Sequence, residues 1–168
     1  MNKMLLVSTV AATLGATSFV HAQPAAPPLA GDAVETLQKV CLPVLRGGDL
    51  KASAASAGFV MKDGQWTLTV DRDTSIALNP PDTANPRVCG ASITAPFGDA
   101  LALKRAVAAW ARTQTPPLAA VKLAPAIGSG WTSSLWTGAG ESVTLGQEHA
   151  GAPTASAQAN LQLTLKPT

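Results

Sequence analysis

His149 is the single histidine beyond the first 22 residues, so any Ser-His-Asp or Cys-His catalysis in the mature chain would depend on it. It directly follows Glu148, and neighbouring side chains on a strand point to opposite faces, so the two are poorly placed to pair. No Gly-x-Ser-x-Gly nucleophile elbow occurs in the sequence. These features favour a loop histidine exposed to solvent, and a small periplasmic hydrolase using His149 is the alternative interpretation.

Asp71 and Asp73 flank Arg72 and could supply paired carboxylates for acid-base catalysis or for a hard cation. Calcium needs six or more oxygen ligands, and the surrounding sequence offers few. Aspartate is also a common turn residue, and this segment lies between two predicted strands. We therefore predict a turn, with a hydrolase built on Asp71/Asp73 as the alternative. The sequence predicts no cofactor and no metal site.

Trp131 and Trp136 lie in the most unusual stretch, GSGWTSSLWTGAGES. They differ in parity, so a regular strand cannot bury both on one face, and one should point outward or lie in a turn. An outward tryptophan among Ser and Thr residues can bind a sugar or a protein partner. A phosphate loop is disfavoured because a strand, not a helix, is expected next. The stretch is the best candidate for a binding surface, and a hairpin with one core tryptophan is the alternative.

Cys41 and Cys89 are the only cysteines. An even count in an exported chain favours a disulfide. A disulfide that closes a loop of this length would stabilise the folded protein by about 4 kcal/mol. Cys41 follows the helical spacing of Val34, Leu37 and Val44, while Cys89 shares a strand face with other apolar residues. A Cys41–Cys89 bridge would therefore join a helix to a sheet.

The N-terminus has the layout of a secretory signal peptide over residues 1–22. Lys3 precedes an uncharged run, and cleavage is expected between Ala22 and Gln23, which predicts a periplasmic or secreted protein without a membrane anchor after cleavage. Residues 23–30 are rich in Pro and Ala and predict a disordered leader. Removing Lys3 leaves one basic residue more than the 10 acidic ones, with no basic run, so nucleic acid is disfavoured as a partner.

Periodicity predicts a mixture of helices and antiparallel strands in residues 31–168. A first helix should be capped by Asp32 with Glu35 in a capping box, and Pro43 should kink or end it. Asp49 and Asp99 should cap two further helices. Alternating residues predict six strands, at 65–71, 74–80, 87–94, 130–138, 141–147 and 160–166.

The order of these elements repeats. Gly-Asp-Ala opens a helix at Gly31 and again at Gly98, and a tryptophan begins the first strand of each half, Trp66 and Trp131. We expect a single α+β domain with helices packed on antiparallel sheet, and either two tandem helix-then-three-strand units, 31–96 and 97–168, or a coincidental match between common capping residues.

The helix carrying VCLP, the following SAGF and the strand with Trp66 resemble small uncharacterised periplasmic proteins of proteobacteria over residues 36–66. The resemblance implies location and a disulfide but no activity. The predicted architecture is also similar to secreted proteins made of tandem helix-then-sheet units, including protein inhibitors of β-lactamase. Together these features predict a non-catalytic periplasmic binding or protein-interaction module, with another periplasmic protein or a small ligand as its partner.

Overall fold

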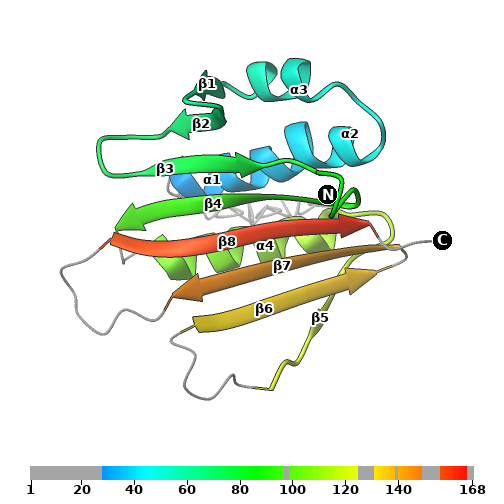
Figure 1. Cartoon of the computed structure of the whole chain (residues 1–168). Coiled ribbons are helices and arrows are strands. Elements are labelled where there is room, and N and C mark those ends of the chain that lie inside the picture. Colours follow the sequence, from blue (N-terminus) through cyan, green and yellow to red (C-terminus); the bar gives the residue numbers. More distant parts are fainter. Residues whose placement is uncertain (1–27, 97–98, 125–130, 139, 149–155, 166–168) are drawn as a thin grey trace, which may run out of the picture.

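Helices cover one face of an eight-stranded antiparallel sheet in the computed structural model (Figure 1). The structure describes residues 28–96, 99–124, 131–138, 140–148 and 156–165. The predicted signal peptide, its cleavage site at Ala22 and Gln23, and His149 lie outside the described residues. The expected α+β class, with helices packed on antiparallel sheet, is confirmed for the described chain.

The first helical stretch runs without a break through α1 (Pro28–Glu35), the π-helix η1 (Thr36–Cys41) and α2 (Leu42–Leu45). It includes Pro28–Ala30, which the sequence assigned to the leader, and Asp32 lies inside it rather than at its cap. Burial of Leu29 and Ala30 outweighs the local capping signal. Pro43 does not end the helix, because the wider π turn before it lets Leu42 N–H donate to Leu37 O.

Two further helices follow the predicted pattern. Helix α3 (Leu50–Ser56) is capped by Asp49, whose carboxylate accepts the N–H of Ala52 at 2.6 Å. Helix α4 (Ala100–Thr113) buries an apolar stripe of Leu103, Val107, Trp110 and Ala111. Asp99 precedes α4, but its side chain makes no capping hydrogen bond, unlike the prediction.

The sheet has the strand order β1-β2-β3-β4-β8-β7-β6-β5. Each half of the chain contributes four strands, not the predicted three, because the three-residue edge strands β1 and β5 were not foreseen. Strand β8 also begins at Ser156, earlier than the predicted strand 160–166. The strands are β1 (Val60–Lys62), β2 (Gln65–Thr69), β3 (Ser75–Asn79), β4 (Val88–Pro96), β5 (Ala119–Val121), β6 (Trp131–Gly138), β7 (Glu141–Glu148) and β8 (Ser156–Leu165).

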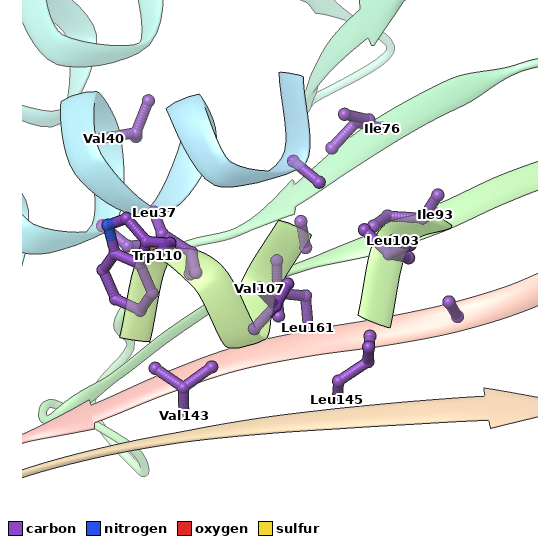
Figure 2. Close-up of a cluster of buried hydrophobic side chains, with 14 of the residues drawn as sticks. Leu37, Val40, Ile76, Ile93, Leu103, Val107, Trp110, Val143, Leu145 and Leu161 are labelled. Atoms are coloured by element: carbon purple, nitrogen blue, oxygen red, sulfur yellow. The ribbon is translucent and has the colours of Figure 1, made fainter. Parts of the chain in front are cut away.

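The core lies between the helices and the covered face of the sheet (Figure 2). Leu37 and Val40 from η1, Val107 from α4 and strand residues such as Val143 and Leu161 belong to this core, and all of them are at most 1% exposed. The predicted Cys41–Cys89 disulfide is confirmed: it joins η1 to β4, with 5.3 Å between the Cα atoms. Both cysteines are fully buried, so the bridge is part of this core.

Candidate binding surface

One face of the sheet is not covered by the described helices, which all lie on its other side (Figure 1). Side chains alternate between faces along each strand, so the register identifies those on the open side. We call this side the outer face. Over β3, β4, β7 and β8 most of its residues are small or polar, and Val88 and Pro96 at the two ends of β4 are apolar exceptions. The small and polar residues are Ser75, Ala77, Asn79, Gly90, Ser92, Thr94, Ser142, Thr144, Gly146, Gln158, Asn160, Gln162 and Thr164.

Trp131 lies on the outer face, whereas Trp136 on the same strand is 4% exposed in the core. The five-residue separation of the two tryptophans in the regular strand β6 places them on opposite sides, as their parity predicted. Trp66 packs against the core side of the sheet. Trp66 and Trp131 therefore occupy opposite faces and are not counterparts in a repeat. This corrects the expectation that they hold equivalent positions in the two halves of the chain.

Gly146 on β7 supports the Trp131 ring. A Cβ atom built at this glycine would lie 3.6 Å from Cε3 and 3.8 Å from Cζ3 of Trp131. The six-membered ring of the indole therefore lies across β7, in van der Waals reach of the backbone. Gly146 is paired with Asn160 on the next strand, β8, so the ring approaches the middle of the sheet. Trp131 is partly buried, so part of its surface lies exposed on the outer face.

A short chain of hydrogen bonds crosses the outer face beside this ring. The Asn79 side-chain amide donates to Ser92 Oγ at 3.0 Å, and Ser92 Oγ donates to Asn160 Oδ1 at 3.2 Å. This arrangement fixes the Asn160 carbonyl and leaves its two N–H groups outside the chain. The Gln158 and Gln162 side chains, also on β8, are exposed and make no hydrogen bond to another described residue.

The outer face is almost free of charge. Across β3, β4, β6, β7 and β8, the one charged side chain at its described positions is Glu148, at the end of β7 opposite Trp131. Trp131 is evident as a candidate from the sequence, whereas Asn160, Gln158 and Gly146 are not. The alternation of β8 revealed its polar side, but that β8 lies between β4 and β7 was not evident from the sequence.

Asp71 and Asp73 form the predicted turn between β2 and β3. The Asp71 carboxylate accepts the backbone N–H of Asp73 at 2.9 Å, and both residues are exposed. The end of β7 at Glu148 is three strand spacings from β3, about 14 Å, so the turn lies apart from Glu148. The described part of the chain contains no group of three His, Cys, Asp or Glu residues able to hold a metal ion.

A groove of about 470 Å³ lies on the helical side between the α1–η1 stretch and α4. Its lining includes Val34, Ala106, Ala109 and Trp110. The indole Nε1 of Trp110 is buried and makes no hydrogen bond with the described residues. The groove carries one acidic and one basic residue, Glu35 and Lys39, which form an ion pair with each other.

Comparison of the chain with protein-family models, with curated proteins and with solved structures gives no match. Among the helices of the described residues, none is long and apolar enough to cross a membrane.

Proposed function

We propose that the chain is an exported, non-catalytic binding module and that the outer face is its binding surface. The observation that carries the proposal is Trp131, a large aromatic side chain that lies partly exposed on the open sheet face, with its ring against Gly146. Large aromatic side chains exposed in this way supply much of the binding energy in recognition surfaces. Export is supported by the signal-peptide pattern of residues 1–22 and by the buried Cys41–Cys89 disulfide.

The proposal includes a tandem origin for the binding surface. Each half supplies a helical layer followed by four antiparallel strands, and the strand order is the same from either edge, with β4 and β8 paired at the centre. Val40 and Val107 are separated by the same 67 residues as Gly31 and Gly98, and both valines are fully buried. A duplicated unit accounts for a continuous face broad enough to bind an extended partner.

The test compares two truncations of surface apolar side chains on opposite sides of the molecule. Wild-type protein, Trp131→Ala and Leu101→Ala are immobilised and exposed to periplasmic extract, and the retained proteins and glycans are quantified. Leu101 is the matched control because it is 56% exposed on α4, on the helical side. We expect Trp131→Ala to lose about tenfold or more of the retained component and Leu101→Ala to keep it. Equal retention by both variants would contradict the proposal.

A further inference from the structure

We infer that the outer face binds a neutral saccharide chain, lying along β8 with one sugar ring stacked on Trp131; this inference rests on the proposed binding function of that face. Three features of the described residues carry it: a row of amide side chains, an indole ring beside that row, and the near absence of charge.

The amide row consists of Gln158, Asn160 and Gln162, all exposed on the outer face of β8. Alternate residues of a strand are about 6.7 Å apart, so the row offers an amide at regular intervals along an extended ligand. Each primary amide carries two N–H donors and a carbonyl acceptor. Neighbouring hydroxyl groups of a pyranose ring, each of which both donates and accepts, complement this combination.

Asn160 is the best-positioned member of the row. Its Oδ1 accepts from Ser92 Oγ, which in turn accepts from Asn79, so the orientation of the amide is fixed before a ligand arrives. A donor held in place loses less conformational entropy on binding than a mobile one. The two N–H groups of Asn160 are therefore the donors that we expect to contribute most to hydroxyl recognition.

Trp131 supplies the complementary apolar contact. A pyranose ring presents C–H groups on its flat side, and an aromatic face packs against them while the hydroxyl groups project toward polar neighbours. Gly146 lets the indole lie across β7 toward β8, and the strand that bears Trp131 is about 10 Å from β8. A sugar ring stacked on the indole would therefore place its hydroxyl groups beside the amide row.

The near absence of charge on the outer face favours neutral ligands over charged ones. No Lys or Arg stands at the described outer-face positions of β3, β4, β6, β7 and β8, and Glu148 beside Trp131 would repel anions. Nucleic acids, acidic glycans and anionic headgroups therefore lack a cationic partner there. A protein partner is less favoured, because the centres of protein interfaces are apolar and rich in aromatic residues, whereas the middle of this face presents mainly Ser, Thr, Asn and Gln with Ala and Gly between them.

The experiment titrates the exported protein with cellohexaose, maltohexaose and chitohexaose, with polygalacturonate as the charged counterpart. Calorimetry gives the affinity, and ¹⁵N NMR follows the side-chain amides of Gln158, Asn160 and Gln162. We expect at least one neutral hexasaccharide to bind and to shift these resonances, with affinity unchanged between about 50 and about 500 mM NaCl. Trp131→Ala should weaken binding about tenfold or more, and Asn160→Ala by several-fold. Trp131→Phe should retain part of the affinity, which separates loss of the ring from misfolding.

Gln38→Ala is the matched control, because Gln38 is an exposed amide on η1, on the helical side. It should bind like the wild type. Failure of all three neutral hexasaccharides, preference for polygalacturonate, or binding that survives both Trp131→Ala and Asn160→Ala would overturn the inference. If the sugars fail but Trp131→Ala still abolishes capture of a periplasmic protein, the saccharide assignment is wrong and the proposed function stands. If Trp131→Ala changes neither readout, both are wrong.

Discussion

At the scale of single residues, Asp32 carries a carboxyl group whose surroundings disfavour its ionised form. Burial, and to a smaller extent the charge of Glu35, raises the pKa of its carboxyl above the ordinary value. The folded state therefore holds this proton more tightly than the unfolded state, and stability falls as the pH rises through the interval between the unfolded and folded pKa values. At neutral pH the ionised Asp32 carboxylate therefore destabilises the folded state. At low pH the carboxyl is protonated and this destabilisation is absent.

We therefore expect Asp32→Asn to raise the melting temperature at pH 7 and to have a smaller effect near pH 3. The measurement is thermal unfolding followed by circular dichroism at both pH values. Asp73→Asn serves as the control, because Asp73 is exposed in the β2–β3 turn and its carboxylate contacts no described residue. A larger gain for Asp32→Asn at pH 3 than at pH 7 would show that the sign is wrong.

Local chemistry was predictable where only neighbouring residues decide the structure. The parity of Trp131 and Trp136, the Asp49 cap and the Asp71–Asp73 turn all depend on contacts within a few residues, and all three are confirmed. The Asp32 cap failed because burial of Leu29, a contact with distant parts of the chain, decides where the first helix starts.

At the scale of elements, Gly90 shows how closely β4 approaches β8. A Cβ atom at this position would lie 2.4 Å from the carbonyl oxygen of Leu161, a contact that only movement of the backbone could relieve. Gly90→Ala should therefore destabilise the protein by about 1–3 kcal/mol in urea unfolding. Gly31→Ala makes the same chemical change in α1, where no atom lies within 4 Å of the new Cβ, and should stabilise by about 0.5–1 kcal/mol. Similar effects from both substitutions would contradict this assignment.

The short strands β1 and β5 could not be predicted from the pattern of apolar and polar residues. Each has three residues, all exposed, so neither displays the alternation of apolar and polar residues that reveals a strand. They exist as strands because β2 and β6 offer them backbone hydrogen bonds. No periodic pattern in the sequence predicts the π-helix η1 either, because it arises where a continuous helix must accommodate Pro43.

At the scale of the whole molecule, the outer face is a property of strand order rather than of any segment. Strand β8 is last in sequence but lies between β4 and β7, and this placement brings Asn160 beside both Ser92 and Gly146. The same placement joins the two halves of the chain. Nine residue pairs link β4 to β8, α1 packs on α4, and Arg46 donates to Glu141 at 2.8 Å.

Because the sheet is continuous, we expect a substitution that destabilises one half of the chain to lower the stability of the other half as well. The Cys41–Cys89 disulfide lies within the first half, and replacing both cysteines with alanine should cost about 2–5 kcal/mol. In a Trp66→Phe background every remaining tryptophan, Trp110, Trp131 and Trp136, belongs to the second half. If the sheet unfolds as one cooperative unit, the double cysteine replacement should lower the urea midpoint of tryptophan fluorescence and of far-UV circular dichroism by the same amount.

Independent halves would behave differently, because the fluorescence midpoint would stay near that of the parent Trp66→Phe protein while the circular dichroism transition separates into two steps. Trp66 lies against the core from β2, so its replacement alone lowers stability, and the comparison is made between variants that share it. The coincident shift is expected because the pairing between β4 and β8 is central in the sheet and cannot open at one strand without exposing the core side of the other, including Ile93 and Leu161.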